Sequence, residues 1–494
     1  MTLGQLCERS GVGRSGGNHH VEDVAVAGVV LDSRIVTTGD LFVALRGEHV
    51  DGAAFARDAL ERGAVAVVSE NARPDDIDTP WVQVDDARAA VATLAANFYG
   101  NPSHELLVVG TTGTNGKTTT TYLVESILEE GGIPCGRISS VSHRIGEEER
   151  QAERTTPEAP DLQALMRRMV DSGCRACVME VSSHALDLRR ADGIRFAAAV
   201  FTNLTRDHLD YHGDMPRYFA AKRRLFEMLG DTTPAVINVD DLYGRELAPT
   251  VQRALTYSID APSDIRPERL DLSLGGIELD IRTPRGLLHV RSPLLGRNNA
   301  YNVLAAAATA AALSLPFRAI ERGLGSVEHV PGRMEIVSSE ADDVGVLVDF
   351  AHTDDALRGL LETARPLARG RLVTVFGCGG DRDTTKRPLM GAVAARLSDV
   401  VVVTSDNPRS EDPASIAKDI ECGLGSEEAQ WLTVLDREEA IARAISDARP
   451  GDLVVVAGKG HERHQVVGTR SLPFEDAVVA RTALDRRRSR SRVG

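Results

Sequence analysis

The chain has 494 residues, of which 42% are hydrophobic and 26% are charged, and its net charge is −15 at pH 7. On size alone it forms about two to four domains, and its apolar content is ample for several packed cores. The acidic balance disfavours extensive binding to nucleic acid or anionic membranes, and no stretch approaches the roughly 20 apolar residues of a membrane helix. The first residues carry no basic-then-apolar signal pattern, so we expect a cytoplasmic protein.

The six cysteines are too few for a disulfide framework in a chain of this length. Cys174 and Cys177 form a C-x-x-C pair, but no second pair follows at the spacing of a zinc site. Cys177 also enters an apolar run. We therefore expect buried or loop thiols rather than a metal or redox site.

The first two sections of the chain differ in pattern. Residues 1–103 alternate short apolar runs with turn-rich and helical pieces, which predicts a small α/β domain. Residues 104–329 show strand–helix alternation, which predicts a mostly parallel sheet with helices on both faces. Within them, residues 264–292 look like antiparallel strands, and the alanine-rich run 304–315 predicts a buried helix. The apolar runs of the first section lie at 24–31, 41–45 and 64–68, and the other expected strands of the second lie near 106–110, 176–181, 197–203 and 235–239.

Residues 330–494 repeat the alternation, so we expect three α/β domains in all. The last residues, 486–492, are a short basic tail that we expect to be solvated and disordered rather than to bind nucleic acid. The strands of this third section are expected near 345–350, 371–376, 398–404 and 452–456.

The strongest local motif is a glycine-rich loop at residues 110–119, between an expected strand and an expected helix. Its glycines let backbone amides turn towards phosphate oxygens, and the helix N-terminus favours negative charge. Lys117 would reach the β- and γ-phosphates of a nucleotide, and the Thr118 hydroxyl would ligate Mg²⁺. Thr111 stands where the strict pattern has glycine, so the loop is a variant. The predicted nucleotide-binding residues here are Gly113, Thr114, Asn115, Gly116, Lys117, Thr118 and Thr119.

Two polar segments follow expected strands further along the chain. Glu180 ends a strand beside the phosphate loop, where a carboxylate is well placed to hold Mg²⁺, although a solvated strand-end glutamate is the alternative. The dense polar run 202–212 is poor core material and typical of an active site. A lone histidine is usually structural, and His208 gains its weight from this context.

With Asn115 preceding Gly116 and Lys117, the loop resembles that of the Mur ligases and their folylpolyglutamate synthetase relatives. The resemblance covers nearly the whole chain, including both polar segments. It implies an α/β, three-domain Mur ligase architecture. A UDP-substrate-binding domain (1–103) would precede a central P-loop ATP-binding domain (104–329), and a Rossmann-like domain (330–494) would bind an amino acid.

The same resemblance implies ATP and Mg²⁺ as cofactors and a carbamylated Lys222. A carbamate turns a cation into an anion that can help place a metal beside the transferred phosphate, whereas the residues alone favour a surface lysine on a helix. Lys117, Glu180, His208 and Lys222 are the implied catalytic residues. The implied metal ligands are Thr118, Glu180, His208 and Lys222, and Asn299, Asn302 and Arg333 are implied to contact the nucleotide.

The N-terminal segments 31–34 and 39–44 resemble the uridine-binding domain of Mur ligases that act on a muramoyl dipeptide. The match places Leu31, Ser33 and the segment 48–50 near the UDP moiety. Polar and cationic groups suit a substrate that bears a diphosphate and carboxylates. The residues implied to contact the muramoyl dipeptide are Thr155, Thr156, Ser182 and Arg190.

Three segments of the third section, 377–388, 406–409 and 458–462, also match the family. An Asp-Asn-Pro-Arg motif marks family members that select meso-diaminopimelate over lysine. Lysine lacks the distal carboxylate, so its binding would leave a buried guanidinium unpaired at a cost of roughly 1–3 kcal/mol. Guanidinium groups would fork onto that carboxylate, and acidic side chains would take ammonium groups. The implied amino-acid-binding residues are Arg382, Asp406, Asn407, Pro408, Arg409, Gly458 and Glu462.

The resemblance predicts ATP-dependent ligation of meso-2,6-diaminopimelate to UDP-N-acetylmuramoyl-L-alanyl-D-glutamate through an acyl phosphate, by a monomer with no nucleic-acid or membrane partner. The C-terminal domain is expected to close over the site and exclude water. Two alternatives are a related ligase using lysine or another amine and a non-catalytic, nucleotide-gated binding protein. The chain departs from the usual family residues at Leu188, Asn298, Phe350 and Asp354.

Overall fold

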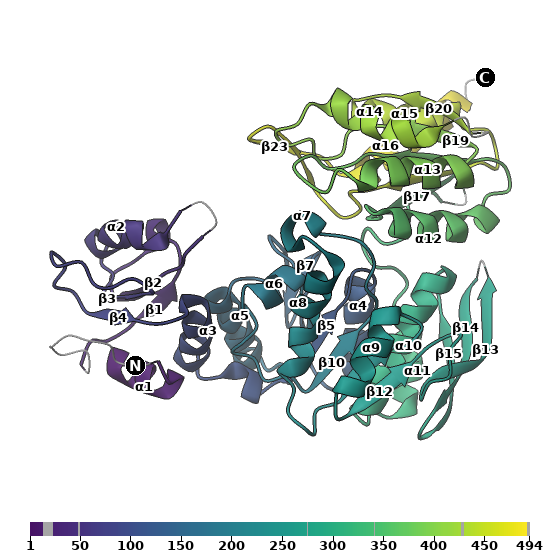
Figure 1. Cartoon of the computed structure of the whole chain (residues 1–494). Coiled ribbons are helices and arrows are strands. Elements are labelled where there is room, and N and C mark those ends of the chain that lie inside the picture. The colour runs from purple at the N-terminus through teal and green to yellow at the C-terminus, as the bar shows by residue number, and fades with distance from the viewer. Residues whose placement is uncertain (13–22, 48–49, 274, 340, 426–428, 492–494) are drawn as a thin grey trace.

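The computed structural model describes residues 1–12, 23–47, 50–273, 275–339, 341–425 and 429–491, which form three α/β domains along the chain (Figure 1). The N-terminal domain has a parallel sheet in the order β1-β2-β3-β4. Helix α2 packs on one face of the sheet, and α1 and α3 pack on the other. The elements are α1 (Leu3–Ser10), β1 (Gly28–Val30), β2 (Asp40–Ala44), α2 (Ala56–Glu61), β3 (Ala66–Ser69), β4 (Trp81–Gln83) and α3 (Ala87–Phe98).

The central domain is built on an eight-stranded sheet in the order β12-β11-β10-β5-β9-β6-β7-β8. Its strands run in one direction except for β7, which pairs antiparallel with both β6 and β8 at one edge of the predicted parallel sheet. Helices cover both faces, because the strands are apolar on both sides. The strands are β5 (Leu107–Thr112), β6 (Cys135–Ile138), β7 (Ser142–Ile145), β8 (Glu148–Gln151), β9 (Ala176–Glu180), β10 (Ala198–Phe201), β11 (Ala235–Asn238) and β12 (Ala254–Tyr257).

One face of the sheet packs on α4 and on the alanine-rich α10, which is buried as predicted. Small side chains let α10 lie close to both the large sheet and the predicted antiparallel strands, which form a separate three-stranded sheet. The helices are α4 (Lys117–Glu130), α5 (Ala159–Asp171), α6 (Ser183–Asp187), α7 (Leu209–His212), α8 (Met215–Glu227), α9 (Leu242–Leu247), α10 (Gly296–Ala312) and α11 (Phe317–Ser326). The small sheet contains β13 (Arg266–Ser273), β14 (Gly276–Thr283) and β15 (Gly286–Ser292).

The C-terminal domain has a six-stranded sheet in the order β16-β17-β21-β18-β19-β20, parallel except for β16. Helices α12, α13 and α14 cover one face and α15 and α16 the other. The strands are β16 (Glu335–Ile336), β17 (Gly345–Asp349), β18 (Leu372–Phe376), β19 (Val400–Val403), β20 (Gln430–Thr433) and β21 (Leu453–Ala457), with a hairpin of β22 (His464–Val467) and β23 (Arg470–Pro473). The helices are α12 (Asp354–Ala364), α13 (Lys386–Leu397), α14 (Pro413–Leu424), α15 (Arg437–Asp447) and α16 (Asp476–Ser491).

The prediction of a disordered basic tail is wrong for the part that the structure describes. Residues 486–491 continue α16, whose apolar side packs on the sheet. Arg487 pairs with Asp343 at 2.7 Å and donates to carbonyl groups at the end of α15, including that of Ala448 at 2.7 Å. Satisfying those free carbonyls gives the arginine a structural role that charge counting overlooks.

The two cysteines of the C-x-x-C pair are buried in the apolar core of the central domain, in agreement with the expected thiols. Among the described residues, no helix combines the length and apolar character needed to cross a bilayer.

Candidate functional site

A cavity of about 1050 Å³ lies between the central and C-terminal domains, and a second of about 200 Å³ adjoins it. The larger cavity is at the carboxyl ends of β5, β9 and β10, which is where ligands bind in parallel α/β sheets. The two cavities share lining residues, so they form one branched site. The shared residues are Asp207, His208, Phe350, His352, Arg382, Asn407, Arg409 and Glu462.

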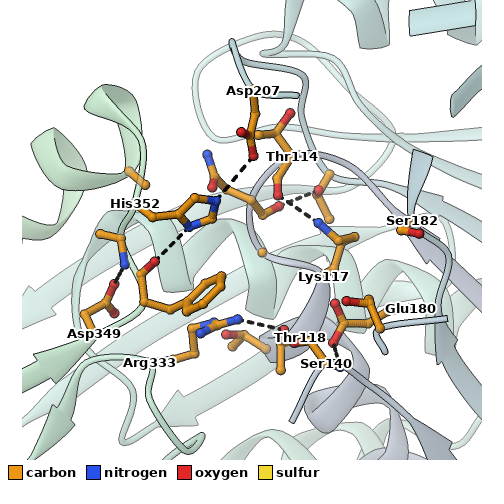
Figure 2. A pocket seen from close by; sticks show the side chains of 18 of the residues that line it. Thr114, Lys117, Thr118, Ser140, Glu180, Ser182, Asp207, Arg333, Asp349 and His352 are labelled. Carbon is orange, nitrogen blue, oxygen red and sulfur yellow. Dashed lines mark hydrogen bonds and ion pairs between the residues drawn. The ribbon is translucent and has the colours of Figure 1, made fainter. Parts of the chain in front are cut away.

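The predicted phosphate loop connects β5 to α4 and lines the larger cavity. Gly113 and Gly116 have φ values of 148° and 88°, and a side chain on Gly113 would collide with the Thr202 hydroxyl. The Lys117 ammonium donates to the carbonyl oxygens of Gly113 and Thr114 at 2.9 and 2.8 Å, and burial lowers the pKa of this lysine (Figure 2). The loop is therefore folded around its own lysine.

Thr118 and Glu180 are brought together by Ser140. The Thr118 and Ser140 hydroxyl oxygens are 3.1 Å apart, and the Ser140 amide donates to Glu180 Oε1 at 2.8 Å. Glu180 is 1% exposed. A hydroxyl and a buried carboxylate beside a phosphate loop fit Mg²⁺, which takes few protein oxygens and completes its shell with phosphate and water. In the described part of the chain, no group of three or more His, Cys, Asp or Glu side chains is placed to hold a metal ion.

Lys222 contacts the phosphate loop, and His208 lines the adjoining cavity. Lys222 is 1% exposed, and its amine donates to the Gly113 carbonyl at 2.7 Å. Burial, with a smaller effect of the Lys117 charge, lowers the pKa of Lys222 well below its usual value. His208 has a φ of 54° and lines both cavities, and burial lowers its pKa to about 3. A neutral imidazole is the form that can ligate a metal.

The structure places the predicted nucleotide contacts Asn299, Asn302 and Arg333 around the same cavity. Asn302 donates to Asn299 Oδ1 at 3.0 Å and lies against Gly116, which has no room for a side chain there. Arg333 comes from the C-terminal domain and donates to the Thr118 hydroxyl at 3.2 Å. The two domains therefore meet at the phosphate loop.

The predicted dipeptide contacts Thr155, Thr156, Ser182 and Arg190 also line the larger cavity. Thr156 Oγ1 donates to the Glu180 carbonyl at 2.9 Å and accepts from the Ser182 amide at 3.1 Å. Arg190 donates to the Thr156 carbonyl at 3.1 Å. These bonds tie the predicted dipeptide contacts to the strand that carries Glu180.

The predicted UDP contacts lie apart from these cavities. Leu31 and Ser33 follow β1 in the N-terminal domain and line neither cavity among the described residues. Glu48 and His49 lie outside the described residues.

The smaller cavity contains most of the predicted amino-acid contacts. Arg409 has a φ of 52° and donates to the Gly380 carbonyl at 2.7 Å, while Arg382 donates to the Asp381 carbonyl at 2.9 Å. Such backbone strain is typical of functional sites. The predicted residues that line the smaller cavity are Arg382, Asp406, Asn407, Arg409, Gly458 and Glu462; Pro408 lines neither cavity among the described residues.

Lys459, which the sequence motifs did not single out, connects residues of this pocket through hydrogen bonds. Its ammonium donates to Asn407 Oδ1 at 3.0 Å, Glu462 Oε2 at 2.6 Å and the His464 carbonyl at 2.7 Å. The Asn407 amide also donates to Glu462 Oε2 at 2.8 Å. One Glu462 oxygen is therefore engaged by the protein, which leaves Oε1 for a ligand.

Two inter-domain contacts were also missed by sequence reasoning. Asp207 Oδ2 lies 3.3 Å from His208 Nε2 and 3.4 Å from His352 Nε2 in the C-terminal domain. Burial alone would raise the pKa of Asp207, but the bond to His352 and the nearby positive charges hold it well below its usual value. His461 Nε2 lies 3.0 Å from the Ser140 carbonyl. Asp207 belongs to the polar run 202–212, so the sequence offered a reason to assign it to the site. Nothing in the sequence around Ser140 offered such a reason.

Two of the four departures from the usual family residues line the site, and two do not. Phe350 lines both cavities, and the Arg333 guanidinium lies over its ring at 4.5 Å. The phenylalanine thus offers a cation–π surface for Arg333. Asn298 lines the larger cavity, while Asp354 begins α12 and Leu188 caps α6; these last two line neither cavity among the described residues.

Comparisons with known proteins agree with this geometry. Residues 25–99 match the model of the Mur ligase family catalytic domain, 111–310 the Mur ligase middle domain and 332–460 the Mur ligase glutamate ligase domain. A UDP-N-acetylmuramoyl-L-alanyl-D-glutamate–2,6-diaminopimelate ligase of Gloeobacter violaceus is 47% identical over 491 residues, which is 99% of each chain. One of the same name from Solibacter usitatus is 47% identical over 93% of each chain.

Solved structures give the same result. A UDP-N-acetylmuramoyl-L-alanyl-D-glutamate–2,6-diaminopimelate ligase has a TM-score of 0.69 at 33% identity, covering 98% of this chain and 99% of its own. The MurF ligase of Thermotoga maritima, solved with ADP, shares the fold with a TM-score of 0.66 at 20% identity, covering 95% and 100% of the two chains. With three family models in order along its length and full-length relatives at 47% identity, the chain belongs to the Mur ligase family.

Proposed function

We propose that the protein is an ATP-dependent ligase that adds meso-2,6-diaminopimelate to UDP-N-acetylmuramoyl-L-alanyl-D-glutamate in peptidoglycan biosynthesis. The observation that carries the proposal is the branched cavity, in which a phosphate loop opens directly onto a pocket with both guanidinium and carboxylate groups. Such a pocket suits an amine that also bears a carboxylate. Full-length relatives with this name support the choice of substrates.

In the first step a carboxylate oxygen of the glutamyl residue attacks the γ-phosphorus of ATP, and ADP leaves. Lys117 would exchange its loop carbonyls for phosphate oxygens, and Arg333 would add a second positive charge from the C-terminal domain. Thr118, Glu180, His208 and modified Lys222 would hold Mg²⁺, which would neutralise phosphate charge when bound. Positioning and charge neutralisation carry most of such a reaction.

In the second step the amine of diaminopimelate attacks the acyl carbon, loses a proton and displaces inorganic phosphate. Arg382 and Arg409 would bind a carboxylate of the amine substrate, and Asp406 and the free oxygen of Glu462 would bind its ammonium group. The contacts between the domains would keep water from the acyl phosphate.

Carbamylation of Lys222 is part of this proposal. The modification needs an unprotonated amine, whose nitrogen bonds to CO₂ and then loses a proton. Burial lowers the pKa of Lys222, which increases the fraction of this unprotonated form. We also propose domain limits at 103 and 329, a cytoplasmic location and a monomer.

The test is ADP release with the UDP-linked dipeptide, offering meso-diaminopimelate or lysine in parallel, for the wild type, Lys117→Met and the surface control Lys418→Met. We expect turnover with diaminopimelate, loss of turnover in Lys117→Met and normal turnover in Lys418→Met. Turnover with lysine alone would overturn the assigned amine. ATP binding without turnover for either amine would favour the nucleotide-gated binding protein.

A further inference from the structure

Lys386 is a buried cation that the reaction described above does not use. It is the first residue of α13, is 7% exposed and lines the smaller cavity. Within the described part of the chain, its ammonium has no hydrogen bond and no ion pair. By contrast, its neighbour Arg387 pairs with both Glu411 and Asp419.

The position of Lys386 favours an anion beside it. Only 7% of the residue is exposed, and the start of a helix adds partial positive charge. Asp207 interacts with Lys386 electrostatically, but its carboxylate contacts His208 and His352. A cation that faces a cavity under these conditions is arranged to receive a negatively charged ligand group.

We infer that Lys386 binds a carboxylate of diaminopimelate, an assignment that rests on the proposed function. The substrate has two carboxylates, and the arginine pair, Arg382 and Arg409, accounts for one of them. The two arginines line both cavities, whereas Lys386 lines the smaller cavity alone. Lys386 is therefore placed to bind the carboxylate that the arginine pair leaves free.

The test compares Lys386→Met with the exposed control Lys418→Met in steady-state ADP release. We expect Lys386→Met to raise the KM for meso-diaminopimelate by about 10- to 100-fold, the loss of a hydrogen bond to a charged group. The KM values for ATP and the UDP-linked dipeptide should change less than about twofold, since neither substrate uses the amine pocket. The thermal midpoint should not fall, because the substitution removes a buried charge without a partner.

A second arm tests whether the contact is with a carboxylate. 1,5-Diaminopentane keeps both amines of the substrate and lacks both carboxylates. Its kcat/KM should therefore be the same, within about twofold, in the wild type and in Lys386→Met. An equal fold-loss for 1,5-diaminopentane and diaminopimelate would overturn the assignment.

The anion could instead be the phosphate released from the acyl phosphate. In that case Lys386→Met would weaken product inhibition by inorganic phosphate and leave the KM for diaminopimelate unchanged, which would refute the inference. Absence of ADP release by the wild-type protein with diaminopimelate would contradict the proposed function itself. An active wild type and an unchanged Lys386→Met variant would contradict the lysine assignment alone.

Discussion

Replacing Lys459 by methionine should weaken both the C-terminal domain and its affinity for the amine substrate. The side chain is fully buried and donates to three acceptors, whereas its partner Glu462 is 35% exposed and can regain water. Hydrogen bonds to charged groups contribute about 1.5–3 kcal/mol each, but rehydration of Glu462 offsets part of the loss. We expect a cost of about 3 kcal/mol, or a fall of roughly 6–12 °C in the thermal midpoint of a domain of this size.

The same substitution should misplace Asn407 and Glu462, because Lys459 fixes which way the Asn407 amide points. Thermal unfolding followed by calorimetry would measure the stability loss, and steady-state ADP release would measure the KM for diaminopimelate. We expect that KM to rise about tenfold or more while the KM for ATP stays constant. If Lys459→Met matched the Lys418→Met control in both midpoint and KM, the lysine would not organise the pocket.

Three further predictions use the same assays. Lys222→Ala should lower kcat by about 100-fold or more with little change in the KM for diaminopimelate, since a carbamate would act on phosphate transfer; full activity would exclude the carbamate. Arg409→Lys should raise the KM for diaminopimelate about tenfold, because an ammonium cannot form the forked contact, and an unchanged KM would refute it. Burial, with the Arg333 charge, lowers the pKa of His461 to about 3, so the unfolded chain binds more protons below about pH 6.5 and stability should fall as pH drops. His461→Gln should remove about 1–2 kcal/mol of the loss between pH 6.5 and 5 in urea titrations, and an identical pH slope would show that His461 does not contribute.

The sequence predicted the parts of the site whose chemistry is local. Lys117 and Thr118 stand within one loop of fixed geometry, and Glu180 ends a recognisable apolar strand. Alternation of strands and helices also placed the large sheets, because strands buried on both faces read as continuous apolar runs. For these features a short window of sequence contains the physical cause.

The remaining features depend on contacts between distant segments. Ser140 gains its place from the turn between β6 and β7, which brings it against both Thr118 and Glu180. Lys386 stands out only when the surrounding acceptors are known, and the two antiparallel edge strands carry no pattern that separates them from a loop. The tail was misjudged because arginine-rich ends are usually solvated, whereas here Arg487 binds the free carbonyls of a neighbouring helix.

The amine pocket is made by two domains, and this has a consequence for the order of events. Asp207, His208 and Asp210 come from the central domain, while Arg382 and Lys386 come from the C-terminal domain. A ligand that contacts both sets stabilises the arrangement in which they face each other, because it binds that arrangement more tightly than any other. Arg333 couples the same arrangement to the phosphate loop through Thr118. Nucleotide and amine would therefore each favour the closed form, so that the acyl phosphate is shielded from water when the amine is in place.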